Sequence, residues 1–296
     1  MNILVSGLVN TETSVRVREF PVPYFPIDYP FFGVSSVVGG VGYNISRALK
    51  SLGDSVSFVS FAGDDVTFRT IKNQLESDGI SSVHIQNALK ATAQSVVLYD
   101  PSGRREIYCD LKDIQEQRLD VLKIRPLVKN ADIVCACNIN FNRTLLHEAK
   151  RLGKLVATDV HVLSDPDDEY NREFLENADI VFLSDEALPC PAEELISVLK
   201  NKYPAEIIVM GRGARGATMY ERATDSIRSF DAVPPEKVVN TVGAGDALFS
   251  SFVHFYAKGL GAQNALCRAQ IFASAKIGSN GASLGFLTEE EVEKRV

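Results

Sequence analysis

The chain has 296 residues, 45% of them hydrophobic and 23% charged, and its formal net charge is −7 from 31 basic and 38 acidic side chains. This composition predicts one domain with a sizeable core and a small appendage. The acidic balance argues against nucleic acid or an anionic membrane as a partner. No apolar run approaches the ~18 residues of a membrane span. The chain starts directly with a strand pattern and has no basic leader, so no signal peptide is expected and the cytoplasm is the expected location.

Apolar strand patterns and helical patterns alternate along the chain. We expect strands at 3–6, 56–61, 133–136, 155–158, 180–183 and 207–210, and helices at 42–52, 67–78, 142–151, 191–201, 245–257, 262–278 and 288–295. Val238 and Val239 have the pattern of a further strand end. Continuous apolar strands are typical of a mainly parallel sheet with helices on both faces, so the sequence predicts a doubly wound α/β fold over residues 1–296 as a single domain.

Two segments break this alternation. Residues 14–38 carry four prolines and six aromatic residues, a composition hostile to helix. Residues 93–109 have the pattern of a strand, a turn at Asp-Pro-Ser-Gly, and a second strand. Together they predict a β appendage, and the alternative for the first segment is a proline-rich surface loop packed on its aromatics.

A glycine-rich turn opens an apolar helix near residue 245. Gly243 and Gly245 allow a tight turn, and the free amides of the first helical turn form an anion site. Asp246 lies in that turn, where the helix dipole favours its ionised form, so it is placed to take a proton from a hydroxyl beside a bound phosphate. Taken alone, the pattern is also that of an ordinary helix entrance.

A second glycine block lies 200 residues upstream. Gly39, Gly40 and Gly42 stand at the mouth of an amphipathic helix, just before Asn44. The glycines let a small ligand approach the backbone, and the Asn44 amide offers donors and an acceptor to sugar-type hydroxyls. The alternative role for Asn44 is to cap the start of the helix.

Taken together, these blocks resemble the ribokinase-like (PfkB) family of carbohydrate and nucleoside kinases. The motif from Gly39 to Asn44 resembles its N-terminal signature and Thr241–Asp246 its C-terminal one, while Phe61–Asp65 and Gly211–Gly216 are similar to two segments between them. The blocks occur in family order over about the whole chain. The resemblance implies a ribokinase-like fold with 14–38 and 93–109 as a small β lid over the substrate.

The resemblance also implies roles for individual residues. Asp246 would be the catalytic base, and the amides of Gly243, Ala244 and Gly245 would form the anion hole for the transferring phosphoryl group. Glu12, Gly39, Gly40 and Asn44 would line the acceptor pocket, although an exposed lid charge is the alternative for Glu12. The expected nucleotide-binding residues are Gly211, Gly213, Gly216, Thr241 and Asn280.

The sequence departs from the family pattern at three places. Ser184 and Ala187 stand where relatives often have Asn and Glu near the metal, so the metal ligands stay unassigned, with Asp185 or Glu186 able to act through water. Asn240 replaces an Asp tied to a monovalent cation, so we expect little potassium dependence. Gly211 stands where relatives usually have a threonine in the nucleotide loop.

Other site chemistries have little support. The five cysteines are odd in number and have no ligand-like spacing. The pair Cys135 and Cys137 is expected to be buried and reduced, and the alternative is a metal pair or a disulfide. The four histidines are not at metal-binding intervals and are expected to pack in the core or on the surface. Gly211–Gly216 fits G-x-G-x-x-G, but the strand-like run 217–220 follows where a dinucleotide site needs a helix.

We therefore expect an ATP- and Mg²⁺-dependent kinase that transfers the γ-phosphoryl group to a hydroxymethyl group of a sugar or nucleoside. No G-x-x-x-x-G-K-[S/T] motif occurs, so ATP would be held without a Walker loop. The alternative is a catalytically degenerate kinase fold that binds a sugar or nucleotide as a regulator. The aromatics of 14–38 also predict a homodimer formed through the lid.

Overall fold

The computed structural model describes residues 1–186, 188 and 190–296. Its centre is a nine-stranded sheet in the order β13-β12-β11-β10-β9-β8-β1-β4-β5. The strands from β5 to β11 are parallel, and β12 and β13 are antiparallel at one edge. Their bounds are β1 Asn2–Ser6, β4 Ser55–Gly63, β5 Ile85–Leu89, β8 Ile133–Ala136, β9 Leu155–Val162, β10 Ile180–Ser184, β11 Ile207–Gly211, β12 Ala217–Glu221 and β13 Ser226–Phe230.

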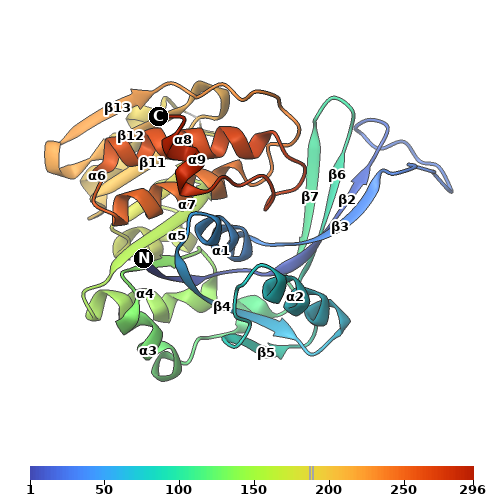
Figure 1. Ribbon diagram of the computed structural model, residues 1–296, viewed down its shortest axis with the longest axis horizontal. Coiled ribbons are helices and arrows are strands. Elements are labelled where there is room, and N and C mark those ends of the chain that lie inside the picture. The colour runs from blue at the N-terminus through green and yellow to red at the C-terminus, as the bar shows by residue number, and fades with distance from the viewer. Residues whose placement is uncertain (187, 189) are drawn as a thin grey trace.

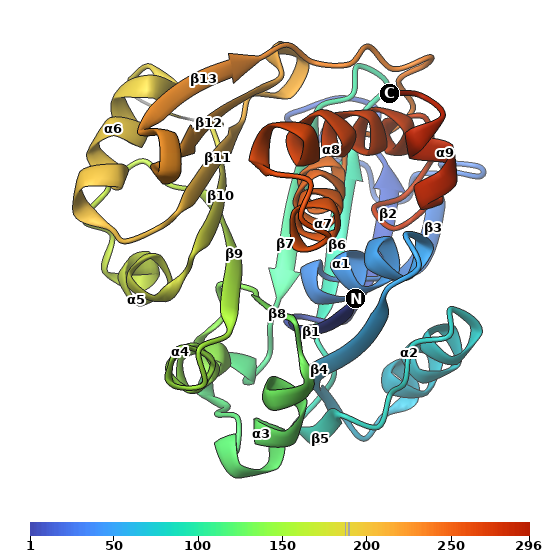
Figure 2. The ribbon, with the colours of Figure 1, turned by 60° about the vertical axis from the view of Figure 1, so that its left-hand side comes forward.

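Helices cover both faces of this sheet, as Figure 2 shows. One face carries α1 Val41–Ser51, α2 Val66–Ser77, α7 Ala244–Ala257, α8 Ala262–Ile277 and α9 Glu289–Glu293. The other carries α3 Val121–Asn130, α4 Arg143–Arg151, α5 Glu169–Asn177 and α6 Ala192–Lys202. Successive strand residues point to opposite faces, so Leu4 packs into one hydrophobic cluster and Val5 into the other. Burial on both faces explains why the strands are continuously apolar.

A second, four-stranded sheet projects from this body as an arm (Figure 1). Its order is β3-β2-β6-β7, with bounds β2 Asn10–Arg16, β3 Val34–Gly39, β6 Gln94–Tyr99 and β7 Arg105–Asp110. The expected β appendage is therefore present, but its first strand starts at Asn10 instead of Ser14. Residues 17–33, where the prolines concentrate, form a strand-free connection between β2 and β3.

Some expectations about elements were wrong or incomplete. Val238 and Val239 do not end a strand; they are 68% and 50% exposed and lie in the connection between β13 and α7. Among the residues that the structure describes, that segment pairs with no strand, and the Val239 amide donates instead to the Ile277 carbonyl at 2.9 Å. Helix α3 was missed because Pro126 interrupts its pattern, and α5 because its apolar face is short. Within the described residues, no helix is long and apolar enough to cross a membrane.

Candidate active site

The site is built around the N-terminal end of α7. Gly243 precedes the helix in the left-handed region with φ 79°, and a Cβ there would lie 2.3 Å from the Ala282 carbonyl oxygen, so only glycine fits without a shift. Asp246 follows in the first turn and is 8% exposed. Burial is the main reason that the pKa of Asp246 is raised to about 6. The carboxylate is therefore mostly ionised at neutral pH, yet remains basic enough to accept a proton.

Helix α1 places Asn44 against this carboxylate. The Asn44 amide nitrogen donates to Oδ2 of Asp246 at 2.8 Å, and this bond favours the ionised form of the acid. Asn44 is 5% exposed, and its Oδ1 has no partner within the described residues. Asn44 is therefore not a helix-start cap, since α1 begins at Val41 with Gly40 as its cap. The unpartnered Oδ1 is a buried acceptor that a ligand hydroxyl can satisfy.

The glycines before Asn44 allow close backbone approaches. Gly40 has φ 95°, and a Cβ there would lie 2.6 Å from the Leu8 carbonyl oxygen. A Cβ on Gly42 would lie 2.8 Å from the Gly7 Cα, so α1 packs directly on the segment that follows β1. Because β1 lies where the strand order reverses, this packing puts the start of α1 at the point where open α/β sheets bind ligands.

The arm contributes two charged side chains. Glu12 of β2 is half-buried, and its pKa is raised, first by burial and then by the nearby charge of Asp246. Arg105 of β7 donates from Nη1 to the Thr241 hydroxyl at 3.1 Å, so the arm contacts the connection that leads into α7. Glu12 was expected from the sequence, whereas Arg105 was missed. An exposed strand arginine has no distinguishing sequence pattern, and only the fold carries it to Thr241.

Lys276 is a second residue that sequence analysis missed. It belongs to α8, is fully buried, and donates from Nζ to the Asn240 carbonyl at 3.1 Å and to the Val242 carbonyl. Burial lowers the pKa of Lys276 to about 8. Its sequence signal is a lysine on the apolar stripe of a helix, spaced four residues after Phe272.

The residues expected to bind the nucleotide lie on two loops. Gly211 ends β11; Gly213 and Gly216 follow with φ 55° and 88°, and a Cβ on Gly216 would lie 1.9 Å from the Phe230 carbonyl oxygen. Asn280 is exposed, and its side-chain oxygen accepts from the side-chain amide nitrogen of Asn240 at 3.4 Å. Strand β12 follows Gly216 directly, which removes the helix that a dinucleotide fingerprint needs.

The expected metal region is only partly described. Ser184 ends β10, the half-buried Asp185 forms an ion pair with Arg215, and Glu186 is exposed. Ala187 lies outside the described residues. No group of three or more His, Cys, Asp or Glu side chains able to hold a metal occurs in the part of the chain that the structure describes. The candidate donors in this region are the oxygen atoms of Ser184, Asp185 and Glu186, which are the kind of ligand that Mg²⁺ accepts.

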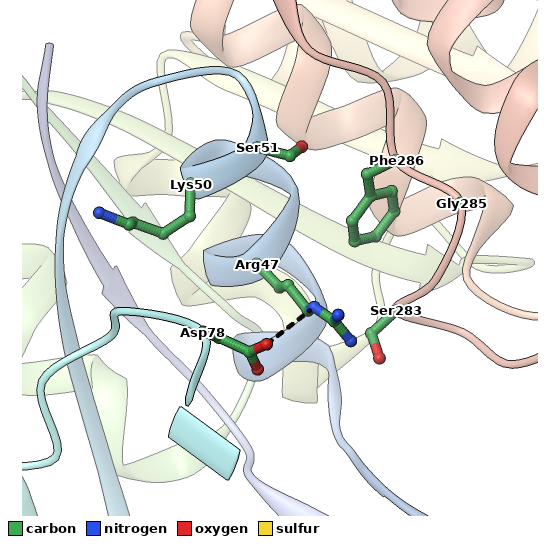
Figure 3. Close-up of a pocket in the computed structure, with 7 residues that line it drawn as sticks. All are labelled: Arg47, Lys50, Ser51, Asp78, Ser283, Gly285 and Phe286. Carbon is green, nitrogen blue, oxygen red and sulfur yellow. Dashed lines mark ion pairs between the residues drawn. The ribbon is translucent and has the colours of Figure 1, made fainter. Parts of the chain in front are cut away.

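Two hollows lie beside α1, away from Asp246. One, of about 300 Å³, is lined by Arg47, Lys50, Ser51, Asp78, Ser283, Gly285 and Phe286 (Figure 3). Arg47 points toward Asp78 there and forms an ion pair at 3.4 Å. The second, of about 270 Å³, shares Arg47 and Ser283 and reaches β2 and β3. Neither lining includes Asp246, Asn44 or Glu12, although the second includes Thr11 and Tyr43, which adjoin Glu12 and Asn44 in the sequence.

The cysteines and histidines lie mainly outside this arrangement. Cys135 and Cys137 are buried free thiols, as expected, but Cys109 and Cys267 are exposed. His254 is buried, and its Nδ1 lies 2.7 Å from Asp54 Oδ2. His254 is therefore a residue of the core. His161, just beyond the sequence-predicted end of its strand, is close enough for its charge to lower the pKa of Asp246.

The chain is similar to known proteins over most of its length. The family described as pfkB family carbohydrate kinase matches residues 2–289. The acarbose 7(IV)-phosphotransferase of Actinoplanes sp. is 28% identical over 254 residues, which cover 85% of this chain and 84% of that protein. The 1-phosphofructokinase of Borreliella burgdorferi is 28% identical over 235 residues, covering 75% of this chain and 74% of its own length.

Solved structures are similar over nearly the whole chain. A microbiome-derived acarbose kinase has a TM-score of 0.88 at 24% identity, covering 99% of this chain and 97% of its own. The ribokinase of Arabidopsis thaliana complexed with ribose and ATP has a TM-score of 0.83 at 20% identity, with the same coverage. At these identities the structures establish the ribokinase-like fold.

The fold and the family match define a phosphotransferase with an alcohol group as acceptor. The chain belongs to the pfkB family of carbohydrate kinases. The resemblance seen in the sequence and the expected fold class are thus confirmed.

Proposed function

We propose that this protein transfers the γ-phosphoryl group of ATP to a hydroxymethyl group of a sugar or nucleoside, with Asp246 as the general base. The observation that carries this proposal is the buried Asp246 carboxylate, held by Asn44 at 2.8 Å in the first turn of a helix that begins with a glycine turn. A base and an anion site in one helical turn are what hydroxyl activation beside a phosphoryl group needs.

Asp246 has the proton affinity that the reaction needs. Its pKa of about 6 leaves the carboxylate mostly ionised at neutral pH and ready to accept the hydroxyl proton as the oxygen attacks phosphorus. The hydrogen bond from Asn44 fixes one carboxylate oxygen, Oδ2, so the other is available to the acceptor hydroxyl. Asn44 is thus a positioning residue for the base as well as a ligand-facing amide.

The anion hole is formed by backbone amides at the start of α7. The first amides of a helix have no intrahelical acceptor, and the helix dipole adds positive potential there. The Ala244 amide donates to the Thr241 carbonyl at 3.2 Å, so Gly243 and Gly245 supply the better-placed donors for a phosphoryl oxygen. The Gly243 conformation, with φ 79°, aims these amides before the substrate arrives.

The acceptor is held between the body and the arm. Glu12 and Asn44 offer a carboxylate and an amide acceptor to neighbouring hydroxyls, and Gly39 and Gly40 leave room beside them. A Cβ on Gly39 would already lie 3.4 Å from the Glu12 Cβ, so a side chain there would narrow this space. The arm would then act as a lid whose Arg105 adds positive charge next to Thr241.

ATP is expected along the loops of Gly211, Gly213, Gly216 and Asn280, with Thr241 beside the phosphates. Mg²⁺ would bridge the phosphates and neutralise part of their charge, with Asp185 and Glu186 able to hold its water ligands. The ion pair between Asp185 and Arg215 also links the metal region to the nucleotide loop.

One set of measurements distinguishes the kinase from the regulatory alternative. Purified protein is incubated with Mg²⁺-ATP and a panel of sugars and nucleosides that includes ribose and acarbose, and ADP release is measured. Acceptor-dependent release that Asp246→Asn removes supports the enzyme. Saturable binding of a sugar or nucleotide, with no ADP release for any acceptor, would instead support the regulator.

A further inference from the structure

Lys276 is a buried cation that pairs with no carboxylate of the described residues. It is 0% exposed, and buried lysines are rare unless an acid or a set of acceptors compensates the charge. Within residues 1–186, 188 and 190–296, Lys276 forms no salt bridge. Its ammonium instead contacts the carbonyl oxygens of Asn240 and Val242. Backbone carbonyl oxygens are also the groups that coordinate K⁺ in channel filters.

These two carbonyls belong to the segment that leads into the anion hole. In a trans peptide the C=O and the N–H point in opposite directions. Because the Val242 carbonyl points at Lys276, the amide of Gly243 points away from Lys276, and the same holds for Asn240 and the amide of Thr241. The ammonium therefore orients the peptide bonds whose N–H groups face the other side of the segment.

The end of α8 fixes the same segment from a second point. The Ile277 carbonyl accepts from the Val239 amide at 2.9 Å and from the Asn240 amide at 3.1 Å. The Asn240 side chain in turn accepts from the Val242 amide at 2.8 Å. Residues 239–242 are thus held by a helix end plus one buried positive charge. Of these contacts, the positive charge is the one that a free cation could supply.

We propose that the Lys276 ammonium is a built-in replacement for a bound monovalent metal cation, and that it orients the segment 240–243 for phosphoryl transfer. The inference rests on the proposed function, because it assigns a positioning role within that same site. The sequence predicts little potassium dependence because Asn240 replaces an Asp. The Lys276 ammonium gives a second, independent reason for the same prediction.

The charges around Lys276 fit this role. Asp246 of α7 and Glu12 of β2 lie near enough to favour the ammonium form, and Arg105 of β7 disfavours it. Burial nevertheless dominates and lowers the pKa of Lys276 to about 8. The cation is therefore present at neutral pH and is lost as the pH rises through about 8, which a bound metal ion would not be.

The experiment compares two variants that differ in the space they leave. Lys276→Ala removes the charge and opens a space between the carbonyls, whereas Lys276→Met removes the charge but fills that space. Both should lower kcat by about 10- to 100-fold, as expected for a group that orients a site without touching substrate. At constant ionic strength, K⁺, Rb⁺ or NH₄⁺ should restore several-fold activity to Lys276→Ala and none to Lys276→Met. Lys258→Ala, which removes a surface partner of Glu289, is the matched control.

Wild-type activity should be the same in K⁺ as in Na⁺. Strong potassium activation of the wild type would overturn the proposal. It would also be overturned if Lys276→Ala stays folded and active at a lower level and no cation restores its activity. A second readout needs no acceptor: K⁺ should raise the thermal midpoint of Lys276→Ala more than Na⁺ does, and should not do so for wild type or Lys276→Met. Equal responses of all three proteins would overturn the inference even if phosphoryl transfer is demonstrated. If no acceptor is found, the thermal measurement still decides it.

Discussion

Asn44 and Asp246 are 202 residues apart in the sequence and are joined by a hydrogen bond of 2.8 Å in the structure. The bond links the two glycine-rich helix entrances, one from α1 and one from α7, into a single site. It also lowers the pKa of a carboxylate that burial raises, so the base strength of Asp246 depends on both. The main predictions follow from this pair.

Asp246→Asn should abolish phosphoryl transfer without weakening the fold. A general base typically contributes ~10²–10⁴-fold, so a variant that keeps more than about a tenth of wild-type kcat would contradict the assignment.

Because the pKa of Asp246 is raised in the folded state, its ionised form opposes folding at neutral pH, and this effect disappears as the pH falls through about 6. The thermal midpoint of the variant at pH 8 should therefore equal or exceed that of wild type. Asp64→Asn, at an exposed acid of the Phe61–Asp65 segment, is the control and should keep its activity.

The pH profile of kcat/KM should have two limbs. Activity should rise as Asp246 ionises near pH 6 and fall above about pH 8 as Lys276 loses its proton. The lowered pKa of Lys276 means that its ammonium opposes folding below pH 8, so its deprotonation does not destabilise the protein. Loss of activity between pH 8 and 9 should thus occur with no loss of thermal stability from this group. An unchanged basic limb in Lys276→Ala would show that another group titrates there.

Asn44→Ala should affect both the acceptor and the base. Losing the Asn44 amide removes an acceptor from the pocket and raises the pKa of Asp246 further, so the acceptor KM should rise about tenfold or more and the acidic limb should move to higher pH. The KM for ATP should stay unchanged. If neither the acceptor kinetics nor the acidic limb responds, Asn44 has only a packing role.

Glu12→Gln should raise the acceptor KM by about tenfold or more while leaving the KM for ATP unmoved, because charge-assisted hydrogen bonds to hydroxyls are worth about 1.5–3 kcal/mol. Thr13→Ala is the matched control, because Thr13 follows Glu12 on β2 and pairs with Ser36 on the opposite face. An unchanged acceptor KM in Glu12→Gln would place the pocket elsewhere.

Mg²⁺ should be required for turnover. With amides as the main anion-hole donors, the phosphoryl charge stays under-neutralised unless a divalent ion bridges the phosphates. Excess EDTA should remove activity and added Mg²⁺ should restore it, as followed by ADP release. Full activity in EDTA would contradict this requirement.

The lid should pair with that of a second subunit. Tyr24, Phe31 and Phe32 are 88%, 75% and 106% exposed on the connection between β2 and β3, a large apolar area for one chain. Light scattering at micromolar protein should give the mass of a dimer, and Tyr24→Ser combined with Phe31→Ser should give a monomer. A wild-type monomer would count against the dimer.

The sequence by itself determined the elements whose patterns are local. Continuous apolar runs predicted β1, β4, β8, β9, β10 and β11, whereas β5 and β13 at the two edges of the sheet were missed. Helical periodicity predicted α1, α2, α4, α6, α7 and α8 to within about two residues. Gly243 was identified because a turn with positive φ needs glycine, a requirement visible in the residue itself. Asp246 and Asn44 were identified because each follows such a turn at a fixed spacing.

The tertiary structure decided what depends on contacts between distant segments. The bond from Asn44 to Asp246, the Arg105 contact with Thr241 and the Lys276 contacts with Asn240 and Val242 each join elements that are remote in sequence. The pKa of Asp246 is raised mainly by burial, and Lys276 reaches the segment that enters α7 because α8 packs its apolar stripe there. Desolvation and charge act through space, so a linear pattern of residues carries no measure of them.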